Sequence, residues 1–332
     1  MNIFVIIFFV LLFLSKHWIN GKIGHTYFYF LGGFRLENRF TKPMGFGEIL
    51  NHTFSLSKAH FKDLLMILLI IMGPVFLLEA IVQLFSGQSF IREPSSGGAW
   101  YEQIISGFKE GANGTMDSSG ISADWGLIVV GVVSLVFFPV TDAAILFVIN
   151  HIRRNEEFTV RLVLKEGFSR FWPMLGSTLL FVLIVTGLII VPGIIIGLIS
   201  FLGAMANPFL GVLLGNILFL GFALGIGLLL TRWSFYFASV VLDKKSPGFG
   251  RSWRLSRKRT WATLGLYIVF YLIVAAISLA VQGTFSAVLG DSVLNSIITN
   301  LTSLFTTLFF SVGYAVMYLD LKTRHDAEDI KE

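Results

Sequence analysis

The 332-residue chain is 55% apolar and only 14% charged, with a formal net charge of +5 and a mean hydropathy of +0.78. This composition excludes a soluble globular domain, because water could not solvate so much apolar surface. The chain also has no cysteine, which excludes disulfides and thiolate metal sites.

The chain begins with an apolar run at residues 3–14, within an N-terminal segment and linker covering residues 1–41. The run lacks a basic start and a small-residue cleavage site, so we do not expect a signal peptide. It is short for a span, because about 20 apolar residues are needed to cross a bilayer. Two alternatives remain open. The run is an extra membrane anchor, or translation starts later and the segment is not part of the working protein.

Six later stretches are long and apolar enough to cross a membrane. They are residues 64–85, 126–149, 172–198, 207–235, 261–282 and 297–318. None has the two-residue alternation of a barrel strand, and a helix satisfies its own backbone hydrogen bonds in lipid. The sequence therefore predicts an all-α integral membrane protein, a six-helix transmembrane bundle. We expect its membrane domain to cover residues 42–325 and a cytoplasmic tail to follow at 326–332.

Basic residues gather in alternate loops of this arrangement. One set of loops carries Arg35, Arg39, Lys42, Lys58, Lys62, Arg153, Arg154, Arg161, Lys165, Arg170, Lys244, Lys245, Arg251, Arg254, Arg257, Lys258 and Arg259, whereas the other carries Arg92 and Lys109. Because cytoplasmic loops are enriched in Lys and Arg, both ends of the six-span domain are expected in the cytoplasm. The loop near 86–125, rich in Gly and Ser, is then external, and we expect it to be mobile rather than a folded domain.

An amphipathic stretch precedes each pair of spans. These stretches start near Phe46, Val160 and Phe249, and in the third one Arg251, Arg254 and Lys258 form a basic stripe opposite Trp253. We therefore expect three helix pairs, each preceded by a helix in the plane of the cytoplasmic interface. Such helices anchor the protein and set its topology, or they recognise a lipid headgroup or a cytosolic partner. The candidate contact residues are Arg251, Trp253, Arg254 and Lys258.

Small residues recur at spacings of four in the third and fourth spans. The pairs are Gly193 and Gly197, Gly211 and Gly215, and Gly221 and Gly225. This spacing allows helices to approach closely. Packing within one chain and self-association both remain open, and the first is the preferred reading.

Ionisable residues within the spans are candidate site residues, since a charge at bilayer depth costs several kcal/mol. Glu79 is expected toward the outer end of its span, and Asp142 and Arg232 in the cytoplasmic third of theirs. We expect an ion pair between Asp142 and Arg232, with Asp320 as the rival partner. Such a pair either holds spans together or takes part in a proton or substrate relay.

Catalytic motifs are missing from the sequence. It contains no Walker loop, His-Glu-x-x-His helix or Gly-x-Ser-x-Gly elbow. His52 and His60 have a poor spacing for a shared metal ion, and we expect the six histidines to be solvated at the interface. We therefore predict no catalytic residue, no metal, no cofactor and no nucleic-acid partner, and a protein that is not an enzyme.

Four short motifs resemble a known bacterial family. They are Lys42 to Leu50 (KPMGFGEIL), Arg232 to Asp243, Arg251 to Leu255 (RSWRL) with Trp261, and Tyr318 to Lys322 (YLDLK). They are similar to the membrane domain of glycerophosphoryl diester phosphodiesterases and its standalone, uncharacterised relatives, over roughly residues 42–330. The resemblance implies a six-helix bacterial plasma-membrane module.

The resemblance does not extend to the enzyme. In that family the phosphodiesterase chemistry belongs to a separate soluble domain that opens with His-Arg-Gly, and this sequence has no such motif. The matched Arg232, Ser252, Trp253, Arg254 and Asp320 bring no established catalytic role. The resemblance therefore adds a fold but no activity.

These observations predict a non-enzymatic accessory or scaffold protein of the cell envelope. It would engage a protein partner or anionic membrane lipids through its cytoplasmic basic helices. The alternative is a transporter or lipid-handling protein with a cavity near Asp142 and Arg232. A cavity at the membrane midplane lined by Asp142 or Glu79 would favour transport, and a packed core with charges at the cytoplasmic rim would favour the scaffold.

Overall fold

The computed structural model describes residues 42–91, 125–290 and 292–329, and every regular element in these ranges is an α-helix. The chain divides into two units, residues 1–42 and 43–332, and the helices below belong to the second. The predictions for residues 1–41 and for most of the external loop lie outside the described residues.

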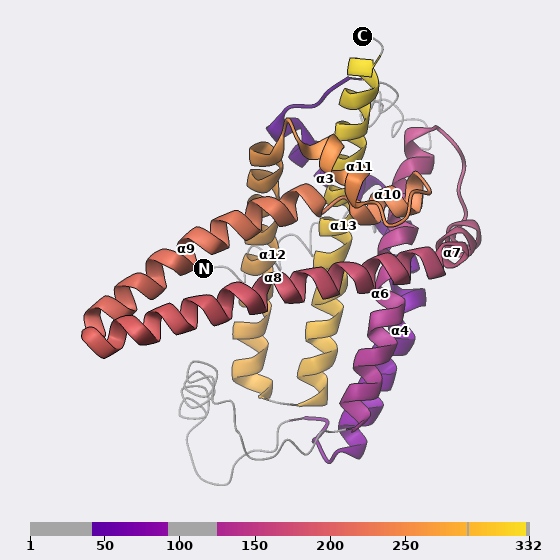
Figure 1. Cartoon of the computed structure of the whole chain (residues 1–332). Coiled ribbons are helices and arrows are strands. Elements are labelled where there is room, and N and C mark those ends of the chain that lie inside the picture. The colour runs from indigo at the N-terminus through magenta and orange to yellow at the C-terminus, as the bar shows by residue number, and fades with distance from the viewer. Residues whose placement is uncertain (1–41, 92–124, 291, 330–332) are drawn as a thin grey trace. The chain divides into compact units, whose positions relative to one another are not determined.

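Six helices are long and apolar enough to cross a membrane, which confirms the predicted fold class. They are α4 (Phe61–Phe85), α6 (Trp125–Arg153), α8 (Phe171–Ala206), α9 (Pro208–Trp233), α12 (Thr260–Leu289) and α13 (Val293–Asp329). They pack chiefly as three consecutive pairs: α4 with α6, α8 with α9, and α12 with α13. The predicted pairing of spans is therefore present (Figure 1).

Four shorter helices complete the described fold: α3 (Phe46–Ala59), α7 (Val160–Ser169), α10 (Tyr236–Leu242) and α11 (Phe249–Ser256). Helices α3, α7 and α11 are the predicted amphipathic helices, and α4, α8 and α12 follow them almost without a break. Helix α10 is new, because the sequence reading ended the fourth span at residue 235. Gly248, with φ of +81°, forms the turn before α11, and a Cβ there would lie 2.4 Å from the carbonyl oxygen of Tyr236. Only glycine fits this position.

Helix α13 is the central helix of the described unit. It packs against α3, α4, α6, α11 and α12, and Val312, Ala315, Val316 and Tyr318 are fully buried. Gly313 permits the close contact with α12, because a Cβ at that position would lie 2.6 Å from the ring of Phe270. The core of the fold therefore lies along the C-terminal half of α13.

Helices α8 and α9 form a hairpin that runs across the direction of α12 and α13 in Figure 1. Asn207 caps α9 by accepting a hydrogen bond from the amide of Phe209 (2.9 Å), and Pro208 occupies the first helical position. A Cβ at Gly211 would lie 2.6 Å from the carbonyl oxygen of Ser200 on α8. Gly211 therefore serves packing within the chain, the preferred reading for the glycine pairs.

Exposed apolar side chains cover most of this hairpin, and they include Leu183, Ile194, Leu198, Phe209, Val212 and Leu220. Its buried residues other than Gly211 are Met174, Ser177 and Thr231, which lie where α8 begins and α9 ends. The hairpin is thus attached to the rest of the unit at its base, and a lipid environment suits the remainder.

Candidate functional site at the basic end

Helices α3 and α11 lie at the same end of the described unit as the C-terminal part of α13. The segment before α7 reaches this end as well, because the ring of Phe158 lies 6.1 Å from that of His60, between α3 and α4. The amide of Met44, just before α3, donates to the carboxylate of Asp320 on α13 at 2.7 Å. At the opposite end, the amide of Val293 donates to the carbonyl oxygen of Ser89 at 3.2 Å. Figure 1 shows α3, α10 and α11 beside the C-terminal part of α13. The basic segments that the sequence assigned to one side of the membrane therefore share one end, the basic end.

Asp243, directly after α10, joins three elements at this end. Its carboxylate accepts hydrogen bonds from Tyr318 (2.7 Å) and Lys322 on α13, and it pairs with Arg251 on α11. Burial opposes ionisation of this carboxyl group, but the hydrogen bonds from Lys322 and Tyr318 and the charges of Lys322 and Arg251 outweigh burial and lower its pKa. Asp243 thus fixes α11 against the central helix.

Arg232, in the last turn of α9, is held in one position by α11 and the start of α12. Its Nε donates to Oγ1 of Thr260 at 3.1 Å, and its guanidinium carbon lies 4.6 Å from the centre of the Trp253 ring. Its carbonyl oxygen accepts hydrogen bonds from Ser252 (2.7 Å) and Ser256 (3.1 Å). These contacts orient the guanidinium without a carboxylate partner among the described residues.

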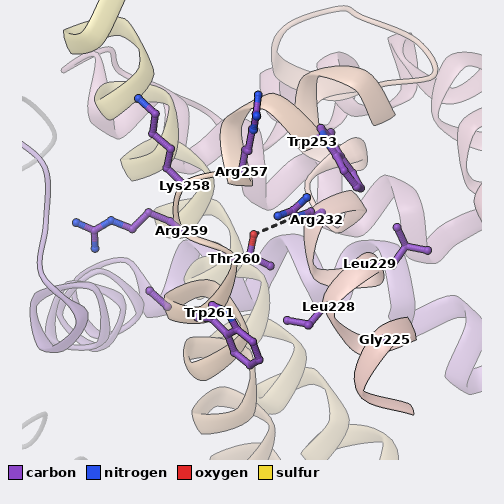
Figure 2. A pocket seen from close by; sticks show the side chains of 11 residues that line it. Gly225, Leu228, Leu229, Arg232, Trp253, Arg257, Lys258, Arg259, Thr260 and Trp261 are labelled. Atoms are coloured by element: carbon purple, nitrogen blue, oxygen red, sulfur yellow. Dashed lines mark hydrogen bonds between the residues drawn. The ribbon is translucent and has the colours of Figure 1, made fainter. Parts of the chain in front are cut away.

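A pocket of about 720 Å³ lies around Arg232, between the end of α9, the end of α11 and the start of α12 (Figure 2). Four of its lining residues are basic: Arg232, Arg257, Lys258 and Arg259. Its apolar wall includes Gly225, Leu228 and Leu229, and Trp253 and Trp261 also line it. None of the eleven lining residues is acidic, so the pocket is strongly electropositive.

The predicted ion pair between Asp142 and Arg232 is wrong. Asp142 instead accepts a hydrogen bond of 2.7 Å from the hydroxyl of Ser311 on α13. The rival partner, Asp320, pairs with Arg324 one turn later (2.8 Å). Arg232 projects into the pocket described above, whereas Asp142 lies in the packed middle of α6, where Thr141, Ala143 and Ala144 are fully buried.

Glu79 lies toward the other end of α4, as expected from its place in the span. Its carboxylate accepts hydrogen bonds from Asn300 on α13 (2.9 Å) and from Gln83 on its own helix (3.2 Å). Glu79 and Asp142 line neither the pocket around Arg232 nor the smaller pocket beside Asp320. These two carboxyl groups link spans to α13 through polar contacts.

The predicted contact residues divide into two groups. Trp253 and Lys258 line the pocket, and Arg254 is exposed on the same helix as Trp253. Arg251, in contrast, forms an ion pair with Asp243 and does not line the pocket. The sequence reading did not select Arg257 and Arg259 as site residues, although they form the consecutive basic run just before Trp261. That run at a membrane edge is the signal that would have identified them.

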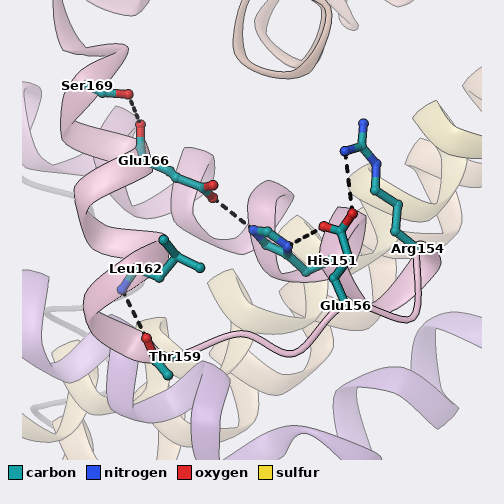
Figure 3. A network of polar contacts seen from close by, with 7 residues as sticks. All are labelled: His151, Arg154, Glu156, Thr159, Leu162, Glu166 and Ser169. Atoms are coloured by element: carbon teal, nitrogen blue, oxygen red, sulfur yellow. Dashed lines mark hydrogen bonds and ion pairs between the residues drawn. The ribbon is translucent and has the colours of Figure 1, made fainter.

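Helix α7 is fixed by a separate polar network, drawn in Figure 3. His151, near the end of α6, contacts Glu156 through Nδ1 and Glu166 on α7 through Nε2, both at 2.9 Å. Thr159 caps α7 by accepting a hydrogen bond from the amide of Leu162 at 3.3 Å. This network fixes the orientation of α7, on which Arg161 and Lys165 are exposed.

The histidines do not all lie where the sequence suggested. His52 is buried, only 2% exposed, on the inner face of α3, so the expectation that it is solvated is wrong. Burial lowers the pKa of His60, although the charge of Asp63 opposes this shift. Within residues 42–91, 125–290 and 292–329, no group of three His, Cys, Asp or Glu side chains is arranged to hold a metal ion.

Residues 64–320 match a family described as a domain of unknown function, DUF7847. Neither the curated proteins nor the solved structures yield a match. The matched range begins in α4, ends in α13, and includes α11 and the whole pocket around Arg232. Because this match covers well over half of the sequence, the chain belongs to the DUF7847 family.

Proposed function

We propose that the protein is a non-enzymatic accessory or scaffold protein of the plasma membrane that engages anionic lipids through its basic end. The observation that carries this proposal is the convergence of exposed cations from three amphipathic helices and their flanking segments. These residues are Lys58, Lys62, Arg161, Lys165, Arg254, Arg257, Lys258 and Arg259. Each Lys or Arg near an anionic leaflet contributes roughly 1 kcal/mol of attraction, so the group acts collectively.

Exposed apolar side chains on the same helices support membrane contact. Phe54 on α3 and Phe168 on α7 are about half exposed, at 51% and 49%. Trp172 and Trp261, in the first turns of α8 and α12, are 77% and 66% exposed. Apolar insertion beside basic residues is how interfacial helices bind an anionic membrane surface. In this proposal the basic end and both ends of the six-span domain lie in the cytoplasm.

Lipid engagement is favoured over transport by the positions of the charged groups. The exposed cations lie at the basic end. The carboxylates of Asp142 and Glu79, in contrast, accept hydrogen bonds from Ser311 and Asn300 within the helix bundle. We also retain the proposed kinship with the membrane domain of glycerophosphoryl diester phosphodiesterases. Ser252 and Trp253, two residues that carry the resemblance, both contact Arg232.

The proposal is tested by extracting the full chain with its surrounding lipid into polymer-bounded nanodiscs. The ratio of anionic to zwitterionic phospholipid is compared with that of the bulk membrane. We expect enrichment of anionic lipid that declines as salt is raised, because the attraction is screened. The combined variant Lys58→Gln, Arg161→Gln, Lys165→Gln and Arg254→Gln should lose most of this enrichment.

The matched control changes the same four positions but keeps the charge: Lys58→Arg, Arg161→Lys, Lys165→Arg and Arg254→Lys. It should retain the enrichment of the original chain. Equal lipid composition in the nanodisc and the bulk membrane would contradict the proposal. So would a stoichiometric protein that occupies the basic end in place of lipid.

A further inference from the structure

We propose that the pocket around Arg232 is a specific site for one anionic glycerophospholipid molecule. Its phosphate would lie among Arg232, Arg257 and Arg259, and the first part of its acyl chains would lie against Leu228 and Leu229. This inference rests on the proposed function, which it sharpens from a charged surface to a single site.

The first argument is the state of Arg232. This side chain is half-buried in a wall that contains Leu228 and Leu229, and no described carboxylate pairs with it. A guanidinium withdrawn from water without an anion is unfavourable. Its Nε donates to Thr260, and one face of its guanidinium lies over the Trp253 ring. The two terminal nitrogens of the guanidinium are therefore available to a ligand. A phosphate group is the anion that this planar fork binds best.

The second argument is the combination of charge and volume. Arg257 and Arg259 are exposed, line the same pocket and have no ion pair in the part of the chain that the structure describes. The volume of about 720 Å³ lies within the ordinary range for small-molecule sites, roughly 300–1,000 Å³. Thr260 and Trp261, which also line it, begin α12, and the start of a helix adds a favourable field for an anion.

The third argument separates a lipid from a free phosphate ion. The pocket continues into exposed apolar surface along α9, since Leu224 and Leu220 are 55% and 66% exposed. Trp261, 66% exposed on the pocket rim, is the residue type that lies at headgroup depth. A free phosphate ion would gain nothing from contact with this apolar wall, whereas the acyl chains of a lipid would pack against it. The chemistry shared by both ligands is the phosphate group, and the position of the pocket favours the lipid.

Gly225 provides a test that changes shape but not charge. A Cβ at Gly225 meets nothing within 4 Å, and the residue lines the pocket, so the variant Gly225→Leu should fold and fill part of the site. Gly221, one turn earlier on α9, has the same open surroundings but does not line the pocket. The variant Gly221→Leu is therefore a matched control.

The experiment is native mass spectrometry of the full chain from nanodiscs that contain equal amounts of phosphatidylglycerol and phosphatidylcholine. We expect one retained phosphatidylglycerol per chain, which is lost in Gly225→Leu and kept in Gly221→Leu. The double variant Arg257→Gln and Arg259→Gln should reduce retention by about fivefold for each charge removed. The variant with Arg161→Gln and Lys165→Gln, which removes two charges from α7, should keep this one lipid.

Equal retention in Gly225→Leu and Gly221→Leu would overturn the site, even if general enrichment of anionic lipid persists. Absence of anionic enrichment in every form of the chain would overturn both this inference and the proposed function. Retention of phosphatidylcholine equal to that of phosphatidylglycerol would show that the arginine residues do not select an anionic headgroup, and it would overturn the proposal. Displacement of the bound lipid by millimolar inorganic phosphate would reassign the pocket to a soluble anion and overturn the lipid assignment.

Discussion

The hydroxyl of Tyr318 on α13 donates a hydrogen bond of 2.7 Å to the carboxylate of Asp243, 75 positions earlier in the sequence. Arg251 and Lys322 pair with the same carboxylate. One buried acid therefore joins the segment after α10, the basic helix α11 and the central helix. It positions α11 beside the Arg232 pocket, so the stability of the fold and the shape of the pocket both depend on this residue.

Replacing Asp243 with Asn should destabilise the fold. The change leaves two cations near each other without a counter-charge, and breaking a mostly buried ion pair costs about 3–5 kcal/mol. We expect a clearly lower thermal unfolding temperature of the full chain in nanodiscs. Asp326→Asn is the control, because Asp326 is exposed near the end of α13 and should change the unfolding temperature little. Similar unfolding temperatures for the two variants would contradict this role of Asp243.

The Asp243 cluster also predicts a dependence of stability on pH. The pKa of Asp243 in the folded chain lies below the ordinary Asp value of about 3.9. Its contribution is therefore present above that ordinary value and is lost as pH falls through the lower, folded pKa. The difference in unfolding temperature between the original chain and Asp243→Asn should be constant from pH 7 to pH 5 and shrink below about pH 4. A difference that shrinks between pH 7 and pH 5 would refute this.

Double-mutant cycles should separate the observed partner of Asp142 from the one expected from sequence. Asp142→Ala combined with Ser311→Ala should show a coupling energy of about 0.5–3 kcal/mol, because each change removes one partner of the hydrogen bond. Asp142→Asn combined with Arg232→Gln should be additive within about 0.5 kcal/mol. The measurement is thermal or chemical unfolding in one detergent. The reverse ranking of the two coupling energies would restore the ion pair.

Much of the fold could be predicted from the sequence. Each predicted span lies almost entirely within an observed helix, because a run such as residues 64–85 must satisfy its backbone in lipid. The three amphipathic helices were also found, since period and charge separate their faces. The crossing of the α8–α9 hairpin was not predicted, because helices that are apolar on all sides carry no information about which face packs.

The site was harder to predict than the spans. Sequence position brought Asp142 and Arg232 to a similar depth, but depth says nothing about which way a side chain points. The ion pair between Arg251 and Asp243 could not be predicted either, because it depends on the turn at Gly248, which brings α11 back alongside α10. Arg257 and Arg259 were visible as a basic run. Their convergence with Arg232 required the end of α9 to lie beside them.

Gly211 should tolerate no larger residue. A Cβ there would lie 2.6 Å from both the carbonyl oxygen of Ser200 and the Cβ of Ala204, so Gly211→Ala should cost about 1–3 kcal/mol by overpacking the hairpin. Gly221→Ala, on the same helix with open space, should be neutral or stabilising by about 0.5–1 kcal/mol. Unfolding of the two variants in nanodiscs measures the difference. Equal stability would show that α8 and α9 do not approach this closely.

The absence of native cysteine allows a clean test of orientation. Lys165→Cys lies on the exposed face of α7 at the basic end, and Gln88→Cys is exposed after α4 at the opposite end. In intact cells a membrane-impermeant maleimide should label Gln88→Cys and spare Lys165→Cys. Lysis should make both react. Labelling of Lys165→Cys in intact cells would place the basic end outside and remove the cytoplasmic leaflet as its target.

The most direct measurement is an electron cryomicroscopy reconstruction of the full chain in nanodiscs with equal phosphatidylglycerol and phosphatidylcholine. We predict headgroup-sized density in the pocket between Arg232, Arg257 and Arg259, continuing as acyl-chain density along Leu228 and Leu229. In a matched reconstruction of Gly225→Leu this density should be absent while the helices keep their positions. An empty pocket in the original chain, or one filled by a protein segment, would contradict the anionic-lipid site around Arg232.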